Sequence, residues 1–383
     1  MTEQVYTNYR LLLPDEEVLG TLVVRDGAIA DIQPDVISYG AAGASIDGNG
    51  EYLLPGLVEL HTDNLERNMI PRPGVMWPIE AAAVYHDRDL ISAGVTTVCD
   101  AISIGDTKPG SIRMTHFAAM IDVIHEGQQA DRYFANHLIH LRCELGYEQV
   151  TDVVGSYADH PLLTLLSLMD HTPGQRQFVD IEKFKEYYMG KHGVSADEME
   201  GFIQQRLDDQ QMHALENRVK LVDLAQSRNV AIASHDDATV DHVKDAVSEG
   251  AAISEFPTTM DAAKEAHLNG LQVLMGAPNL VLGGSHSGNV SAMDLVQVDL
   301  VDIISSDYVP RSLLQSVFLI AERSHLPLYE AAKLVTSNPA RAIGLDGDRG
   351  SLAVGKRADF VTVCHDGTVP MLTSVFNGGH RVA

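Results

Sequence analysis

Short apolar runs alternate with helical stretches through the middle of the chain. The eight runs are Gly56–Leu60, Val95–Ile102, His137–Leu145, Leu162–Met169, Val230–Ser234, Ala252–Phe256, Gln272–Met275 and Leu300–Ser305. Strands that are buried on both faces and separated by helices form parallel sheets. Eight such strand–helix units in a chain of this length predict an α/β fold built on a (β/α)8 TIM-like barrel.

The two ends of the chain differ from the middle, because both are rich in β-prone residues. Gly20–Ile32 holds two such runs around Asp26-Gly27, a dipeptide typical of tight hairpins. Asp359–His365 and Leu372–Asn377 predict further strands. Residues 175–228 exceed the other crossovers in length and have helical patterns, so we expect an acidic excursion over one face of the barrel.

The net charge limits the classes of binding partner that we expect, and the cysteine content indicates the cellular compartment. The 383 residues carry 27 Lys and Arg against 53 Asp and Glu, a formal net charge of −26. Such acidity argues against non-specific binding of nucleic acid or anionic membranes, but not against a small anion in a local basic pocket. Three widely spaced cysteines indicate no disulfide framework, which favours a reducing cytoplasm. The acidic N-terminal segment and the lack of a long apolar run predict neither a signal peptide nor a membrane span.

Imidazoles and carboxylates follow five of the eight predicted strands. In a barrel of this type, residues at the carboxyl ends of the strands meet on one face and carry catalysis. Neutral imidazole and carboxylate together bind Zn²⁺, Mn²⁺ or Fe²⁺, so we predict a site for one or two divalent ions. The predicted ligands are His61, Asp63, Glu144, His171, His235 and Asp307. Asp307 is also the predicted catalytic residue, which accepts a proton from water whose pKa the metal lowers.

Each predicted ligand has a structural alternative. An isolated histidine is more often a core residue than a ligand, and acidic turns such as His235-Asp236-Asp237 often cap helices. For His171, which follows the fourth strand, a substrate contact is the alternative to a metal bond. Agreement among five strand ends favours the metal site over separate caps.

Further stretches resemble the amidohydrolase superfamily. Tyr52–His61 is similar to its entry into the first barrel strand, Ala93–Asp100 to its second strand, and Leu334–Lys356 to its exit from the barrel. The resemblance implies a metal-dependent hydrolase barrel over residues 55–352. It also implies a small β-sandwich domain built from residues 1–54 and 353–383.

The chain differs from most members of that superfamily at two positions. His61-Thr62-Asp63 replaces a His-x-His pair, and Glu144 is the candidate bridge where many members have a carboxylated lysine. A carboxylate in place of imidazole adds negative charge to the site. This change favours Mn²⁺ or Mg²⁺ over Zn²⁺ more than is usual for such barrels.

Within the superfamily, longer blocks resemble the diphosphatases of bacterial phosphonate metabolism. The blocks are His61–Asn68, Pro71–Pro78, His140–Leu145, Ser167–Phe178, Ser234–Thr239, Glu255–Thr259, Leu274–Asn279, Gly283–Asn289 and Ser305–Tyr308. This resemblance implies that water cleaves α-D-ribose 1-methylphosphonate 5-triphosphate to the 5-phosphate and pyrophosphate. Two alternatives stay open: a hydrolase of amides, lactones or amino-purines, and a non-catalytic subunit of the phosphonate machinery.

A triphosphate substrate requires local cations and close approach of the backbone. Arginines lie in or beside the strand-end blocks, and their forked guanidinium suits phosphate oxygens. The Gly-rich segment Gly283–Asn289 lets backbone N–H groups approach phosphate. The predicted substrate contacts are Arg67, Arg72, Arg142, Arg176, Ser285 and His286.

These predicted contacts also have alternatives. Arg67 and Arg72 read equally well as surface cations, Arg142 as an ion-pair partner of Glu144, and the Gly-rich segment as a loop without a ligand. Barrels of this kind often form homo-oligomers, but no segment of the sequence indicates an interface.

Overall fold

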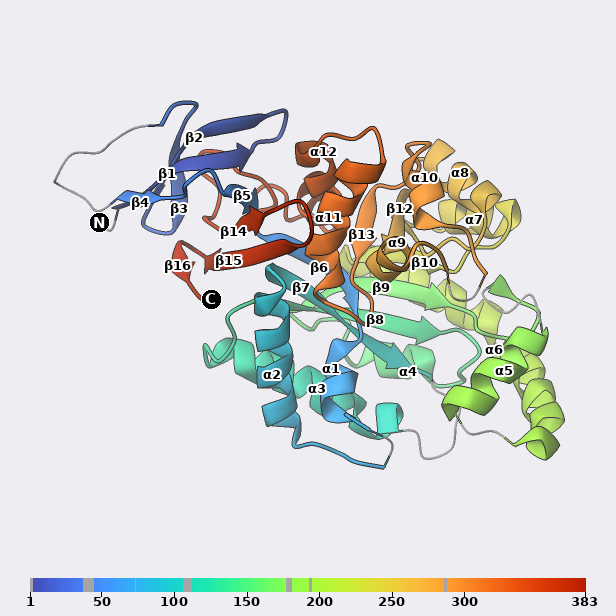
Figure 1. Cartoon of the computed structure of the whole chain (residues 1–383). Coiled ribbons are helices and arrows are strands. Elements are labelled where there is room, and N and C mark those ends of the chain that lie inside the picture. Colours follow the sequence, from blue (N-terminus) through green and yellow to red (C-terminus); the bar gives the residue numbers. More distant parts are fainter. Residues whose placement is uncertain are drawn as a thin grey trace.

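The computed structural model describes residues 3–36, 45–72, 74–105, 112–176, 181–192, 195–285 and 288–383 (Figure 1). Its barrel strands each coincide with one predicted run: β6 (Leu57–Thr62), β7 (Val95–Ile104), β8 (Asn136–Glu144), β9 (Leu163–Met169), β10 (Ala231–His235), β11 (Ile253–Glu255), β12 (Gln272–Gly276) and β13 (Ile303–Ser305). They form one sheet in chain order, and every pair within it is parallel. The predicted (β/α)8 barrel is confirmed.

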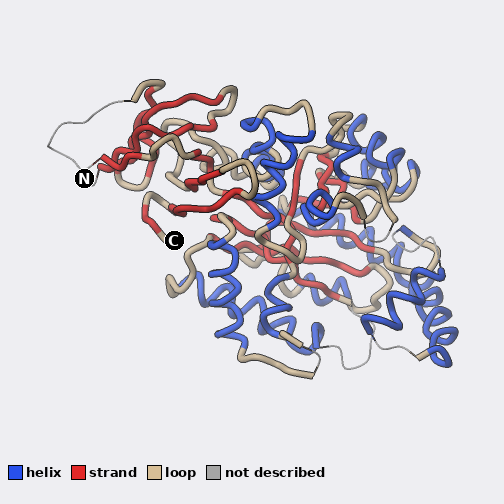
Figure 2. Tube along the Cα trace, viewed as in Figure 1, coloured by secondary structure: helices blue, strands red, loops and turns tan. Residues whose placement is uncertain are grey.

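Helices surround this sheet, as Figure 2 shows by colour. They are α1 (Asn64–Met69), α2 (Ile79–Ser92), α3 (Ile112–Gln129), α4 (Val150–Gly155), α5 (Ile181–His192), α6 (Ala196–Arg228), α7 (Val240–Ser248), α8 (Met260–Leu268), α9 (Ala277–Leu282), α10 (Ala292–Val296), α11 (Ser312–Arg323), α12 (Leu328–Lys333) and α13 (Ser337–Ala342). Across the described residues, no helix combines the length and apolar character needed to cross a membrane.

The first and last barrel strands meet at their carboxyl ends. The amide of Asp307 donates to the carbonyl of His61 (3.1 Å), and the hydroxyl of Ser305 donates to the same carbonyl (2.7 Å). A buried apolar cluster packs deeper among the strands, and its strand members are Val58, Leu60, Cys99, Leu165, Ala233, Ile253, Leu274 and Ile303. This packing fills the barrel with side chains and leaves its carboxyl end for polar groups.

Strands from both chain ends form a second, mostly antiparallel sheet. They are β1 (Glu3–Leu12), β2 (Glu17–Arg25), β3 (Ala28–Gln33), β4 (Ser45–Asp47), β5 (Tyr52–Pro55), β14 (Phe360–His365), β15 (Pro370–Asn377) and β16 (His380–Arg381). The predicted hairpin is β2–β3, and Asp26 (φ 50°) and Gly27 (φ 83°) adopt the left-handed conformation that its turn requires. Tyr6 packs against Phe360 and Phe376, so both chain ends share one core. The domain boundaries at 54/55 and 352/353 stay a prediction.

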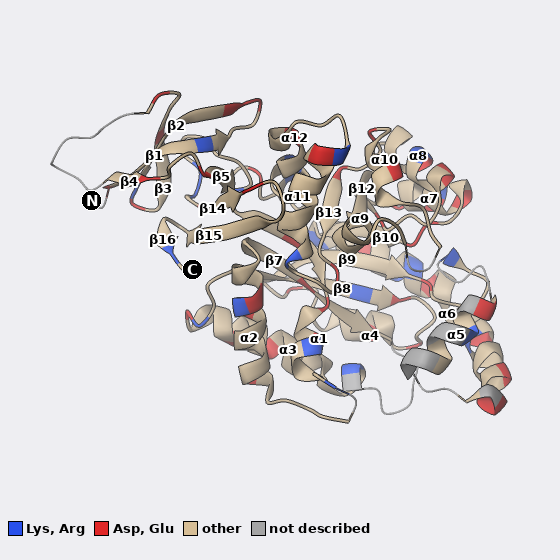
Figure 3. Ribbon diagram, viewed as in Figure 1, with Lys and Arg blue, Asp and Glu red and all other residues tan. Residues whose placement is uncertain are grey.

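The excursion after β9 contains α5 and the long helix α6, as the sequence predicts. A capping box of Ser195 and Glu198 begins α6, and Asn229 in the left-handed conformation ends it. Acidic positions outnumber basic ones along α6, and Figure 3 shows both kinds on this helix. Figure 1 places α6 beside the carboxyl ends of β8 and β9, which puts the excursion next to the predicted site.

Candidate functional site

Residues from the first and eighth barrel strands converge at the carboxyl end of the barrel. His61 is buried, and its ring lies 5.1 Å from that of His140 and 5.7 Å from that of His235 between centroids. The Oδ1 atom of Asp63 is buried and has no hydrogen-bond partner among the described residues. Burial raises the pKa of Tyr308, and the charges of Asp307 and Asp63 add to this, so both carboxylates lie near the tyrosine.

Glu255, at the end of β11, links two of the predicted ligands. Its Oε1 atom lies 2.6 Å from Nδ1 of His61, and its Oε2 atom lies 2.8 Å from Nδ1 of His235. Burial alone would raise the pKa of Glu255, but the imidazoles of His61, His140 and His235 hold it well below its usual range. The carboxylate therefore accepts from both Nδ1–H groups. In a neutral imidazole, the Nε2 atom is then the unprotonated one, which can bind a metal.

Glu144 and His171 form a second pair, between the ends of β8 and β9. The Oε1 atom of Glu144 accepts from the backbone N–H of His171 (3.0 Å), and its Oε2 atom lies 2.7 Å from Nδ1 of His171. Burial would lower the pKa of His171, but Glu144 and Asp236 raise it to about 9. The two carboxylates thus favour positive charge at this position.

Asp236 completes a group of donors that fits a divalent ion. One ligand atom from each of His171, His235 and Asp236 lies within 4.8 Å of the others. The Oδ2 atom of Asp236 faces Nε2 of His171 at 3.6 Å and Nε2 of His235 at 3.4 Å, and it makes no hydrogen bond within the described part of the chain. A buried carboxylate oxygen without a hydrogen bond is costly unless a cation compensates it. Imidazole and carboxylate donors suit Zn²⁺, Mn²⁺ or Fe²⁺.

His140 contributes to a hydrogen-bonded network in the same region. Its Nδ1 atom lies 2.9 Å from the carbonyl of Leu60, and its Nε2 atom lies 2.6 Å from the hydroxyl of Ser167. That hydroxyl donates to Glu255 (2.6 Å). Burial lowers the pKa of His140 to about 3. Both ring nitrogens already have partners, so the contacts favour support of Glu255 over direct metal binding.

Arg142 is a predicted phosphate contact whose charge acts on Asp236. It projects from β8 two residues before Glu144, and its charge lowers the pKa of Asp236, where burial acts in the opposite direction. Its Nε atom is buried without a hydrogen-bond partner in the described ranges. Glu144 is paired instead with Arg206 (3.3 Å), so the ion pair considered for Arg142 is not the one observed. A donor of Arg142 thus stays available to a ligand.

The other predicted substrate contacts lie in different surroundings. Arg67 is exposed on α1 and donates to the carbonyl of Tyr308, while Arg72 is exposed in the loop after α1. Ser285 is half-buried beyond α9, and His286 lies outside the described residues. Their roles in substrate binding stay predictions.

Arg176 is buried and holds the end of β10. It pairs with the carboxylate of Asp237 and donates to the carbonyl of His235 (2.9 Å). The cap of α7 is Thr239, which accepts from the amide of His242 (3.2 Å), so Asp236 and Asp237 are not the caps considered from the sequence. These contacts favour a structural task for Arg176, and its predicted contact with substrate stays untested.

A second buried cluster lies beneath α2, and its contacts identify it as structural. Asp100 lies 2.6 Å from Nε2 of His86 and 2.7 Å from Nδ1 of His137. The remaining ring nitrogens face Asn64 (3.3 Å) and Asp87 (3.2 Å). All four ring nitrogens have protein partners, so the cluster offers no free ligand atom on either histidine. Burial would lower the pKa of His137, but Asp100 and Asp87 raise it to about 9.

The pair of Asp100 and His137 should make stability depend on pH. Because the folded-state pKa of His137 is raised from 6.5 to about 9, its contribution is complete below about pH 6.5 and is lost as pH rises through about 9. Asp100→Asn should therefore lower the free energy of unfolding by about 3 to 5 kcal/mol near pH 6. The loss should be clearly smaller near pH 9.5. Denaturant unfolding at both pH values measures this, and equal losses would contradict the assignment.

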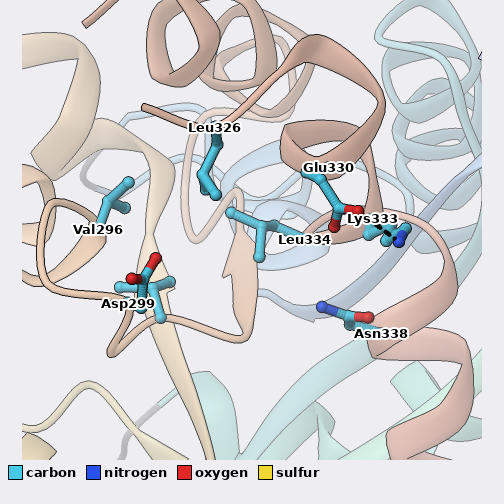
Figure 4. Close-up of a pocket in the computed structure, with 8 residues that line it drawn as sticks. Val296, Asp299, Leu326, Glu330, Lys333, Leu334 and Asn338 are labelled. Carbon is cyan, nitrogen blue, oxygen red and sulfur yellow. Dashed lines mark hydrogen bonds and ion pairs between the residues drawn. The ribbon is translucent and has the colours of Figure 1, made fainter. Parts of the chain in front are cut away.

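A small cavity lies at the opposite end of the barrel (Figure 4). It measures about 150 Å³ and is lined by Val296, Asp299, Val301, Leu326, Glu330, Lys333, Leu334 and Asn338. Several of these residues precede β13, which places the cavity near the amino ends of the strands. Glu330 pairs with Lys333 (2.8 Å), and the Asn338 amide donates to the carbonyl of Asp302 (2.8 Å). These polar groups are thus already satisfied within the protein.

Sequence reasoning missed several residues of the site. Glu255 is the last residue but one of the predicted run Ala252–Phe256, so the rule that found the other strand ends could have found it. His140 alternates with Arg142 and Glu144 along β8, and this period of two was the available signal. Arg206 lies on α6, far from Glu144 in the sequence, and the residues around it give no signal for the contact of Arg206 with Glu144.

Comparisons with known proteins agree with this fold. Residues 52–380 match the amidohydrolase family. The chain is 42% identical over 380 residues to the α-D-ribose 1-methylphosphonate 5-triphosphate diphosphatase of Escherichia coli (strain K12), covering 99% of this chain and 100% of that protein. The structure of N-acetylglucosamine-6-phosphate deacetylase from Pasteurella multocida is similar in fold, with a TM-score of 0.65, 14% identity and 100% coverage of both chains. N-isopropylammelide isopropylaminohydrolase from Burkholderia multivorans ATCC 17616 is also similar, with a TM-score of 0.63, 16% identity and coverage of 100% and 98%.

Proposed function

This chain belongs to the amidohydrolase family, and we propose that it hydrolyses α-D-ribose 1-methylphosphonate 5-triphosphate to the 5-phosphate and pyrophosphate. The observation that carries the proposal is its 42% identity, over 99% of its length, to the diphosphatase of Escherichia coli with that substrate in its name. The reaction belongs to phosphonate metabolism. The site supports it, because imidazoles, carboxylates and an arginine with an unpaired donor meet at one end of the barrel.

The residues that would hold metal come from several strand ends. His171, His235 and Asp236 form a donor group at the carboxyl end of the barrel, and His61, Asp63, Glu144 and Asp307 are the further candidates. A bound Zn²⁺, Mn²⁺ or Fe²⁺ would polarise a phosphate oxygen and lower the pKa of water toward about 7. The added carboxylates favour Mn²⁺ in this set.

The protein's own groups would perform the remaining steps. Asp307, whose backbone amide donates to the carbonyl of His61, accepts the proton of the attacking water at its carboxylate. Arg142 donates to the phosphate oxygens of the leaving pyrophosphate group, and it makes this contact already in the bound substrate. Arg67, Arg72, Ser285 and His286 would bind the triphosphate farther from the reacting phosphorus, with Arg176 as a further predicted contact.

Arg142→Met should weaken substrate binding more than catalysis. The variant removes the buried donor whose Nε atom has no protein partner among the described residues. We expect KM for the triphosphate to rise about tenfold to a hundredfold, equivalent to the loss of one charged hydrogen bond. Steady-state kinetics at saturating Mn²⁺ measures this. Arg228→Met removes the same charge from the exposed end of α6 and should leave KM unchanged. An unchanged KM in Arg142→Met would contradict the assignment.

A substrate panel tests the proposed reaction itself. The metal-loaded protein is assayed for pyrophosphate release from the ribose methylphosphonate triphosphate and for hydrolysis of cyclic amides, lactones and amino-purines. A neutral amide carries no negative charge that could pair with Arg142. We therefore expect the protein to hydrolyse the triphosphate in preference to the amides, lactones and amino-purines. Preference for amides would overturn the proposal.

We also propose that the enzyme works in the cytoplasm. All three cysteines are free, and Cys99 and Cys143 are buried. Burial raises the pKa of Cys143, which keeps this thiol protonated and unreactive. This pattern suits a reducing compartment. Association of copies into a homo-oligomer is a separate prediction, which analytical ultracentrifugation would test.

A further inference from the structure

The long helix α6 places three polar side chains against the ends of β8 and β9. Arg206 contacts the carboxylate of Glu144 (3.3 Å), and Gln210 donates to Asp170 (3.2 Å). About two helical turns farther along α6, the side-chain amide of Asn217 donates to the carbonyls of Leu145 (2.9 Å) and Tyr147 (3.0 Å). The spacings of four and seven residues put all three on one face of the helix. This face of the excursion is therefore fitted to the end of the barrel that carries the site.

The contact between Arg206 and Glu144 is buried on both sides. The side chains are only 4% and 6% exposed, so water screens the pair weakly. Arginine on a mainly acidic helix, turned inward at such low exposure, is costly to place without a specific partner. The contact is thus unlike the exposed ion pairs elsewhere on α6, such as Lys220 with Glu216.

Glu144 links Arg206 to His171, because it contacts both residues. One carboxylate accepts from the backbone N–H and from Nδ1 of His171, so its position sets the direction of the imidazole ring. The Nε2 atom of His171 then faces Asp236 at 3.6 Å. Glu144 also packs against Gly105 (φ 101°), where an added Cβ would lie 2.8 Å from the Cβ of Glu144. Glu144 therefore contacts both this glycine and Arg206.

We propose that Arg206 is a positioning residue of the active site, which orients His171 through Glu144. The excursion then supports the donor group from outside the barrel strands, and α6 contributes to the geometry of the site. The inference rests on the proposed function, because it assumes that His171 is one of the metal ligands. A purely structural anchor would need no contact with Glu144, since Asn217 already fastens α6 to the loop after β8.

Variants of two arginines on the same helix test this inference. Arg206→Met removes the contact, Arg206→Lys keeps its charge, and Arg218→Met breaks the half-buried pair of Arg218 with Glu249 (2.9 Å), away from the site. Each protein is loaded with Co²⁺ in place of the native ion, and its visible absorption spectrum, kcat and KM are measured. Thermal unfolding is recorded in parallel.

We expect Arg206→Met to change the Co²⁺ spectrum and to lower kcat by about tenfold or more, with KM within about threefold of wild type. Arg206→Lys should recover most of that loss. Arg218→Met should lower only the unfolding temperature. A wild-type spectrum and kcat in Arg206→Met would overturn the inference. Failure of the wild-type protein to bind Co²⁺ or to release pyrophosphate would instead count against the proposed function.

Discussion

Replacing Asp307 with asparagine is expected to lower kcat by about a hundredfold to ten-thousandfold, the range for loss of a general base. Asparagine accepts no proton at neutral pH. The change is otherwise mild, because Asp307 has a φ of 55° and asparagine tolerates the left-handed conformation well. Metal content should stay near the wild-type value, since His171, His235 and Asp236 are untouched. Pre-steady-state and steady-state release of pyrophosphate measure the loss.

Asp299→Asn is a matched control for this change. Asp299 also adopts the left-handed conformation (φ 57°), but it lies before β13, where it pairs with His325 (2.9 Å) on the surface. The same substitution at that position should leave kcat unchanged. Wild-type turnover in Asp307→Asn would remove Asp307 from the mechanism. Loss of metal from that variant would assign the residue to metal binding rather than to proton transfer.

The second large effect is expected from Glu255→Gln. The carboxylate accepts from Nδ1 of both His61 and His235, whereas an amide has one accepting oxygen and a donating NH₂ group. One imidazole would lose its acceptor and be free to rotate or to change tautomer. We expect metal affinity to fall about tenfold to a hundredfold, with a parallel fall in kcat/KM at limiting Mn²⁺. Metal content after dialysis against a fixed Mn²⁺ concentration measures this.

Glu59→Gln separates this effect from general damage to the barrel. Glu59 is another fully buried carboxylate, but it accepts from the backbone amides of His61 (2.7 Å) and Ser306 (2.6 Å) and from the hydroxyl of Ser305. The amide removes one accepting oxygen here too, but the group that loses its acceptor is a backbone N–H or a serine hydroxyl and not the imidazole of a predicted ligand. This variant should keep its metal. Equal metal loss in both variants would show that Glu255 has no special role.

Local patterns were sufficient to predict the barrel. Runs such as Val95–Ile102 are β-prone and mainly apolar, and their alternation with helices leaves few arrangements other than a parallel barrel. The hairpin at Asp26-Gly27 was predictable for a similar reason, since two neighbouring residues had to adopt positive φ. Strand ends were the useful guide to chemistry, because the fold brings them together regardless of their distance in the sequence.

Contacts between residues far apart in the sequence could not be predicted from local patterns. The pairing of Arg206 with Glu144 joins α6 to β8, and nothing in either segment specifies the other. Likewise, the sequence predicted only a substrate contact for Arg176, and its ion pair with Asp237 became visible only in three dimensions. Such pairs depend on the packing of whole elements. Net charge was equally uninformative about the site, because −26 for the chain coexists with buried arginines beside the ligands.

The most direct test of the account measures metal content and pyrophosphate release on one preparation, before and after chelation. We predict that the protein holds about one or two divalent ions and releases pyrophosphate from α-D-ribose 1-methylphosphonate 5-triphosphate. Chelation should abolish release, and Mn²⁺ or Zn²⁺ should restore it. A metal-loaded protein that releases no pyrophosphate, or release that survives complete removal of metal, would contradict the account.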